Sequence, residues 1–224
     1  HRLRFARFGP ARWLGHLDVM RALELGLLRS GAIAGGDEER VKLSSSPALP
    51  VGVASRAEYL DVESGEGLDP GWDPRCAARR LPRGLRVIAA VPLPPRSRDI
   101  QDVVRRACYR VRLGGIGEGE GSRAVEAFLA REEVPVSRRR KGREQVFDVR
   151  PLVTGLGFSA ARGLEFTVKL SPSGSARPGE VIEAVFGACP ADPDRIERTE
   201  LLAFVGGRWA SPLLAARRPR HRVD

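Results

Sequence analysis

The sequence has no apolar stretch long enough to cross a membrane. Its longest apolar run, residues 87–95, is far shorter than the ~20 residues that a membrane-spanning helix needs. The first residues also lack the charged and then apolar pattern of a signal peptide. Both absences favour a cytoplasmic protein with no membrane partner.

Cysteine is scarce, and the cysteines that are present lie far apart. Cys76, Cys108 and Cys189 form no CxxC pair, and the three histidines are scattered as well. Iron–sulfur clusters and structural zinc sites use closely spaced ligands. We therefore expect no metal and no cofactor. Because no serine-nucleophile motif is present either, we expect a chain that is not itself an enzyme.

Lysine and aromatic residues are few, whereas arginine is abundant. Aromatic residues make up 6% of the chain, and Lys42, Lys141 and Lys169 are the only lysines. Lysine and arginine together number 38 against 28 acidic residues, which gives a formal net charge of +10. A charge of this size favours a polyanionic partner. We take RNA as that partner.

The spacing of apolar residues predicts the same order of elements twice: strand, helix, strand, strand, helix, strand. This order is that of the split βαβ unit. We predict an α+β protein of two tandem ferredoxin-like units with antiparallel sheets. The expected parts are a first unit at 1–95, a linker at 96–106, a second unit at 107–214 with an extra basic hairpin at 134–150, and a disordered basic tail at 215–224.

Basic side chains concentrate around the first strand and at the tip of the expected hairpin, where they could contact a phosphate backbone. About five such contacts to single-stranded RNA would lower the affinity roughly a hundredfold between ~50 and ~200 mM salt. A solvated charged turn is the alternative for the hairpin. The predicted RNA-binding residues are Arg4, Arg7, Arg12, His16, Arg138, Arg139, Arg140, Lys141 and Arg143.

His16 stands at the start of the first predicted helix, two residues before Asp18. It could orient the turn by hydrogen bonding to Asp18 or to a carbonyl, or bind phosphate together with the helix N-terminus. It could also act as the general acid or base of a metal-independent endoribonuclease. That reaction would need further groups, for which Arg12, Lys42 and Tyr59 are candidates. Trp13, beside the helix, is expected in the core.

Four segments of the chain, residues 2–31, 44–62, 141–153 and 174–185, resemble the radical-SAM-linked proteins, a family of unknown function. The most specific of them contains the order GPAR-x-L-x-HLD-x-M-R-A-x-E. The resemblance implies an accessory role beside a radical SAM protein or a ribonuclease E/G-type partner. Residues 32–47 depart from the family pattern, because the Phe-Asn-Pro element is missing there.

Together these features predict a non-catalytic RNA-binding factor in RNA processing or modification, associated with a radical SAM protein. One alternative is an endoribonuclease that uses His16. The other is a protein–protein adaptor for a radical SAM enzyme, in which the positive charge serves solubility.

Overall fold

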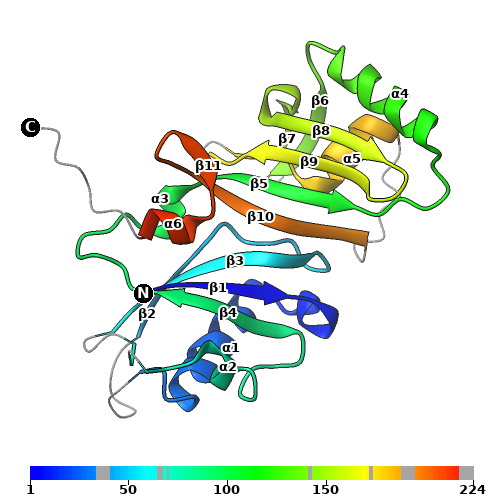
Figure 1. Cartoon of the computed structure of the whole chain (residues 1–224). Coiled ribbons are helices and arrows are strands. Elements are labelled where there is room, and N and C mark those ends of the chain that lie inside the picture. The colour runs from blue at the N-terminus through cyan, green and yellow to red at the C-terminus, as the bar shows by residue number, and fades with distance from the viewer. Residues whose placement is uncertain are drawn as a thin grey trace, which may run out of the picture. The chain divides into compact units, whose positions relative to one another are not determined.

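The computed structural model describes residues 1–33, 41–64, 68–69, 71–140, 143–171, 174–187 and 195–216. The chain divides into two compact units (Figure 1). The first consists of His1–Val104 together with the segment that starts at Glu200, and the second is Arg105–Thr199. The predicted unit limits, residue 95 for the first unit and residue 107 for the second, remain sequence predictions. The compact units follow a different division, in which the chain from Glu200 onward groups with the first unit.

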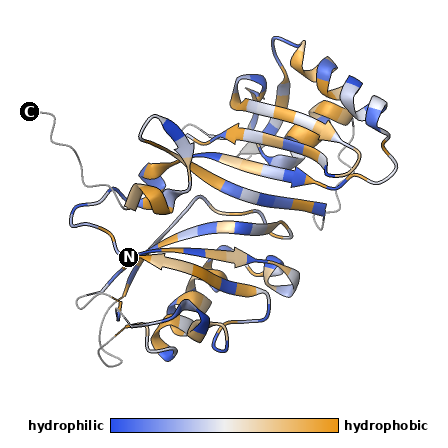
Figure 2. Cartoon of the chain, viewed as in Figure 1, coloured by the Kyte–Doolittle hydropathy of each residue, from blue (hydrophilic) through white to orange (hydrophobic). Residues whose placement is uncertain are grey.

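The first unit contains an antiparallel sheet in which β1 lies between β3 and β4, and β2 pairs with the other edge of β3. Leu3 pairs with Leu60 across β1 and β3, so that two apolar side chains meet on one face. Figure 2 shows β4 as a largely apolar strand. The strands are β1 (Arg2–Arg7), β2 (Lys42–Ser45), β3 (Ala54–Glu63) and β4 (Leu85–Val91).

Two helices, α1 (His16–Arg29) and α2 (Pro74–Ala77), cover one face of this sheet. Their apolar residues and every second residue of the strands form the core, as the period-2 alternation of strand side chains requires. The opposite face carries α3 (Ile100–Val103) and α6 (Pro212–Ala216). Arg2 donates to the carbonyl oxygen of Pro212, the first residue of α6, and to that of Arg98, just before α3. Its guanidinium also forms two hydrogen bonds, of 2.7 and 2.8 Å, with the Asp61 carboxylate.

The second unit contains an antiparallel sheet in which β9 lies between β5 and β8, and a separate two-stranded sheet of β6 and β7. Tyr109 stacks on Phe166 across β5 and β9, with ring centroids 5.4 Å apart. The elements are β5 (Val104–Val111), α4 (Glu118–Leu129), β6 (Pro135–Arg140), β7 (Arg143–Asp148), the 3-10 helix η2 (Arg150–Leu152), β8 (Val153–Ser159), β9 (Gly163–Lys169) and α5 (Pro178–Phe186).

The boundary between the two compact units falls within β10 (Ile196–Val205), which continues into a hairpin with β11 (Arg208–Ala210). The described residues therefore form a mixed α+β structure with mostly antiparallel strands and six α-helices, which confirms the predicted α+β class. Within the described ranges, no helix combines the length and the hydropathy needed to cross a membrane.

The sequence analysis did not resolve β8 as a strand of its own. Its sequence, VTGLGFS, contains Gly155 and Gly157. Glycine is depleted in strands and carries no side chain, so it interrupts the apolar–polar alternation by which a strand is recognised.

Candidate functional site

A tight turn connects β1 to α1 in the first unit. It consists of the 3-10 helix η1 (Gly9–Trp13), followed by Leu14 and Gly15. Gly9 has φ of +52°, a left-handed conformation that favours glycine. Pro10 occupies the first helical turn, where its missing N–H costs nothing.

Arg7 holds this turn from beneath. Its side chain is 3% exposed. Its guanidinium donates hydrogen bonds to the carbonyl oxygens of Ala11, Arg12 and Leu14. Two of these oxygens also accept from a backbone N–H, that of Ala11 from Leu14 and that of Arg12 from Gly52, so the Arg7 bonds add to those that fix the turn. Arg7 was predicted to contact RNA, but the structure places it inside the protein, where it fixes the turn.

The turn also lies against Gly84, just before β4. The Phe8 N–H donates to the Gly84 carbonyl oxygen at 2.9 Å. Gly84 has φ of +92°, and a Cβ added to it would lie 2.0 Å from the Phe8 carbonyl oxygen. Only glycine fits this approach, so the sequence at position 84 helps to fix where Phe8 lies.

Two aromatic side chains project from this fixed turn into solvent. Phe8 is 43% and Trp13 is 54% exposed, so the expectation that Trp13 belongs to the core is wrong. Each ring lies under an arginine: the Arg86 guanidinium carbon is 5.8 Å from the Phe8 ring centroid, and that of Arg12 is 5.8 Å from the Trp13 centroid. We call these four residues the arginine–aromatic surface.

His16 is the first residue of α1 and is exposed. Its Nε2 lies 3.5 Å from Ser45 Oγ. The predicted hydrogen bond to Asp18 is not the one observed, because the Asp18 carboxylate accepts from the Gly15 N–H at 3.2 Å and so caps the helix. His16 and Ser45 also line a small pocket that the buried Glu58 carboxylate closes from below.

Tyr59 does not join His16. Successive residues of a strand point to opposite faces, and Glu58 lies on the face that carries α1. The Tyr59 hydroxyl therefore lies on the other face, where it donates to Glu200 at 2.7 Å. Lys42 pairs with Glu63 at 3.3 Å. The group of His16, Lys42 and Tyr59 considered for RNA cleavage is not assembled.

Arg4 lies on the same face as Tyr59. Its guanidinium donates to the Glu200 carboxylate at 3.0 Å. Burial and the negative charge of Glu200 raise the pKa of Tyr59 well above its usual range. Arg4 and Arg7 therefore do not form the exposed basic face expected of the first strand.

In the second unit, Arg138 of the β6–β7 hairpin is held by α5. Its Nε donates to Glu180 Oε1 at 2.6 Å, and its NH2 group donates to the other Glu180 oxygen and to the Ser175 carbonyl. Its guanidinium also lies 4.3 Å from the Phe147 ring centroid. An arginine predicted to meet RNA is thus neutralised within the fold.

The remaining predicted hairpin residues are defined by their backbone. Arg139 pairs with Glu144, and Arg140 pairs with Arg143. Lys141 lies outside the described residues, as do Cys189 and most of the expected tail, residues 217–224. Cys76 is exposed and Cys108 is half-buried. Among the described residues, no cluster of three or more His, Cys, Asp or Glu side chains could hold a metal ion.

A family model, described as an uncharacterised protein conserved in bacteria (DUF2344), matches residues 1–178. The chain belongs to this family. The match includes the whole turn between β1 and α1 and continues to the first residue of α5. No curated protein matches the chain.

The sequence analysis named Arg12, in this turn, and His16, directly after it, as RNA-binding candidates; it did not include Phe8, Trp13 or Arg86 among them. One signal was available for Trp13. Gly9-Pro10 ends the strand and Gly15 precedes the helix, so Trp13 belongs to neither amphipathic element and has no buried face assigned to it. Nothing near Arg86 in the sequence indicates Phe8 as its neighbour.

Proposed function

We propose that this protein binds single-stranded RNA through the arginine–aromatic surface of its first unit. The observation that carries the proposal is the exposure of Phe8 and Trp13 on a turn fixed from within, each ring with an arginine 5.8 Å from its centroid. Buried aromatic rings would need no such arrangement. Exposed aromatic rings that carry an arginine beside them offer both a stacking face and a positive charge to a ligand.

The chemistry of the surface suits unpaired RNA. A base that stacks on an aromatic side chain contributes ~1–3 kcal/mol, and it can be any base, because every base has a π-face. Arginine adds attraction for phosphate and can stack on bases. The net charge of +10 favours the approach of a polyanion.

Rigidity of the turn supports the same proposal. Arg7 donates to three carbonyl oxygens of the segment, and the Gly52 N–H donates to the Arg12 carbonyl at 2.8 Å. Side chains on a fixed backbone lose less conformational entropy on binding. The proposed interface therefore includes Arg12 and His16 from the sequence prediction and adds Phe8, Trp13 and Arg86. The hairpin residues Arg139, Arg140, Lys141 and Arg143 remain predictions.

Fluorescence anisotropy with a labelled single-stranded RNA, measured from ~50 to ~200 mM salt, tests the proposal. Trp13→Ala should weaken binding about tenfold, the loss of one stacked base. Phe204→Ala is the matched control, because Phe204 is 60% exposed but lies on β10. Equal affinity of Trp13→Ala and wild type, or a larger loss in Phe204→Ala, would overturn the proposal.

RNA cleavage by His16 remains the second prediction, because His16 is exposed on the same turn. The RNA from the binding assay can be analysed on a denaturing gel after incubation with chelator. Cleavage by the wild type that His16→Ala abolishes would support an endoribonuclease. If the RNA stays intact, the endoribonuclease is refuted and RNA binding is the only proposed function left.

The resemblance to radical-SAM-linked proteins suggests that any reaction on the RNA belongs to a partner enzyme. We propose such a partner as an extension of the RNA-binding function. Leu17, 79% exposed beside the turn, could instead serve an adaptor role. Co-purification of a radical SAM enzyme that survives ribonuclease treatment, together with the absence of RNA binding, would favour the adaptor.

We further propose that each unit is ferredoxin-like. The order β4-β1-β3-β2 in the first unit, with α1 after β1 and α2 after β3, supports this assignment. In the second unit, α4 follows β5 and α5 follows β9 in the same manner. An experimental structure in which α1 and α2, or α4 and α5, lie on opposite faces of their sheet would refute it.

A further inference from the structure

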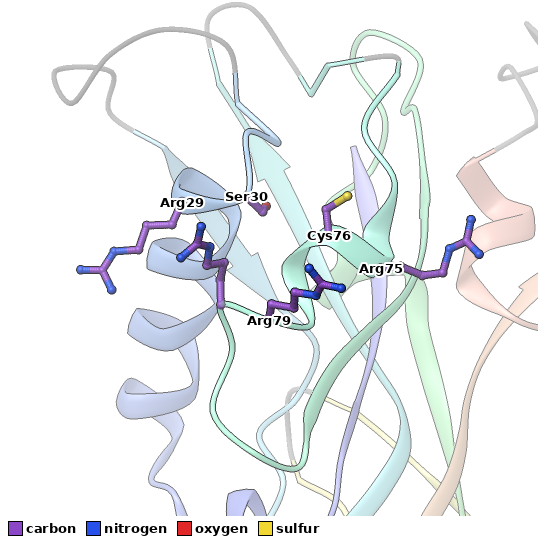
Figure 3. A pocket seen from close by; sticks show the side chains of 6 residues that line it. Arg29, Ser30, Arg75, Cys76 and Arg79 are labelled. Atoms are coloured by element: carbon purple, nitrogen blue, oxygen red, sulfur yellow. The ribbon is translucent and has the colours of Figure 1, made fainter.

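A second basic feature of the first unit lies at the other end of α1 from the turn that contains Phe8 and Trp13. The end of α1 and the segment around α2 enclose a pocket of about 630 Å³ (Figure 3). Arg29 and Ser30 line it from α1. Arg75, Cys76, Arg79 and Arg80 line it from α2 and the turn that follows.

The sequence brings these two segments together through a glycine. A Cβ added to Gly26 of α1 would lie 2.5 Å from Leu81 Cδ2 and 3.8 Å from the Arg80 carbonyl oxygen. The missing side chain at position 26 therefore lets Leu81, in the turn after α2, pack closely against α1. Trp72 adds a second link, since its Nε1–H donates to Ser30 Oγ at 3.1 Å.

The arginines of this pocket differ in their partners. Arg75 pairs with Asp73 at 2.6 Å, and hydrogen bonds from Arg75 hold the pKa of Asp73 below its usual range. Figure 3 shows the Arg75 side chain pointing away from Arg29. Arg29, Arg79 and Arg80 are exposed, and their side chains make no ion pair or hydrogen bond within the described ranges.

Capping of α1 does not explain this cluster. A basic residue in the last turn of a helix interacts favourably with the helix dipole, and Arg29 fills that position. The last carbonyls of α1 already accept from the backbone N–H groups of Ser30, Gly31 and Ala32. Arg79 and Arg80 come from another element and are not needed there.

We propose that this pocket binds a diphosphate or triphosphate group, as carried by a nucleotide or by the 5′ end of an RNA. The planar guanidinium matches phosphate oxygens with paired hydrogen bonds. Three guanidinium groups on two elements call for a ligand with several anionic oxygens, and the pocket volume is that of a small-molecule site. The proposal does not depend on RNA binding at the arginine–aromatic surface.

Calorimetric titration of the full chain with inorganic pyrophosphate tests the site. Arg79→Ala/Arg80→Ala should weaken binding at least about tenfold, since two charge-assisted contacts are lost. Arg21→Ala/Arg131→Ala removes the same charge from exposed positions outside the pocket and should bind as the wild type does. No binding by the wild type, or equal loss in both double variants, would overturn the proposal.

Cys76 provides a local readout that a general charge effect would not change. Its thiol is exposed and lines the pocket. Pyrophosphate should slow the alkylation of Cys76 by iodoacetamide and leave the alkylation rate of Cys108 unchanged. Peptide mass spectrometry measures both rates. Protection of both cysteines, or protection that persists in Arg79→Ala/Arg80→Ala, would contradict a site at this pocket.

The source of the phosphate group is decided by two further titrations. ADP should bind and protect Cys76 if the ligand is a nucleotide. A short RNA with a 5′-triphosphate, compared with the same RNA bearing a 5′-hydroxyl, should do so if the ligand is an RNA end. Trp13→Ala should leave pyrophosphate binding unchanged, which separates this site from the arginine–aromatic surface.

Discussion

The β6–β7 hairpin and the pocket beside α1 are both rich in arginine, yet their arginines are in opposite situations. Arg138 of the hairpin is 17% exposed and bound to both oxygens of Glu180. Arg29, Arg79 and Arg80 of the pocket are exposed, without a carboxylate partner in the described part of the chain. A run of arginines in a sequence therefore measures charge, whereas a binding site needs charge that the fold has left available.

Among the arginines that the fold engages, Arg7 is buried, and Arg7→Ala should have the largest effect on stability. The substitution removes the donor from three backbone carbonyl oxygens, so we expect a loss of about 3 kcal/mol in the free energy of unfolding. Denaturant unfolding measures it. Arg21→Ala, at an exposed position, should change stability by less than about 0.5 kcal/mol. Similar values for the two variants would show that Arg7 is not a structural residue.

Arg138→Ala should follow, with a loss of about 2 kcal/mol, because Glu180 would be left largely buried without its partner. The same variant should bind RNA as the wild type does, since Arg138 is already neutralised. Arg86→Ala should show the reverse: unchanged stability, and a salt dependence of RNA binding reduced by about one phosphate contact. Loss of RNA affinity in Arg138→Ala, with the fold intact, would restore the hairpin as an interface.

The sequence predicts the elements better than the side-chain partners, for reasons that particular residues make clear. The alternation in β1 and the apolar spacing of α1 depend on neighbours two to four residues apart, which a sequence displays directly. Arg138 and Glu180 are 42 residues apart, and Arg4 and Glu200 are 196 apart. No local pattern shows such pairs, so the availability of an arginine could not be predicted.

The exposed aromatic residues were missed for a related reason. Trp13 stands next to Leu14, and a large apolar residue is expected to be buried. Its exposure results from η1, whose path is set by Gly9, by Arg7 beneath it and by Gly84, just before β4. The candidate site is therefore partly local, in Arg12 and His16, and partly a product of the tertiary fold.

Gly26→Ala tests whether the pocket depends on the close packing of α1 against the turn after α2. Alanine favours a helix over glycine by up to ~1 kcal/mol, but here the added Cβ would lie 2.5 Å from Leu81 Cδ2. We expect a net loss of about 1 kcal/mol in stability and weaker pyrophosphate binding. Gly119→Ala in α4 is the matched control: its Cβ would meet nothing closer than Arg123 at 3.8 Å, so no loss is expected. Unchanged binding in Gly26→Ala would separate the pocket from this contact.

The smallest effect concerns Tyr59, which shares the Glu200 carboxylate with Arg4. Burial and the charge of Glu200 raise the pKa of Tyr59, so the folded state keeps its hydroxyl proton at pH values where the unfolded chain has lost it. The stabilisation is complete below the ordinary tyrosine pKa of ~10 and is lost as the pH rises above it. Unfolding followed from pH 8 to 11.5 should show stability falling above about pH 10, and Tyr59→Phe should fall less. If the two proteins gave parallel curves, Tyr59 would be ionising freely in the folded state. The buried hydrogen bond from Tyr59 to Glu200 would then not be kept in solution.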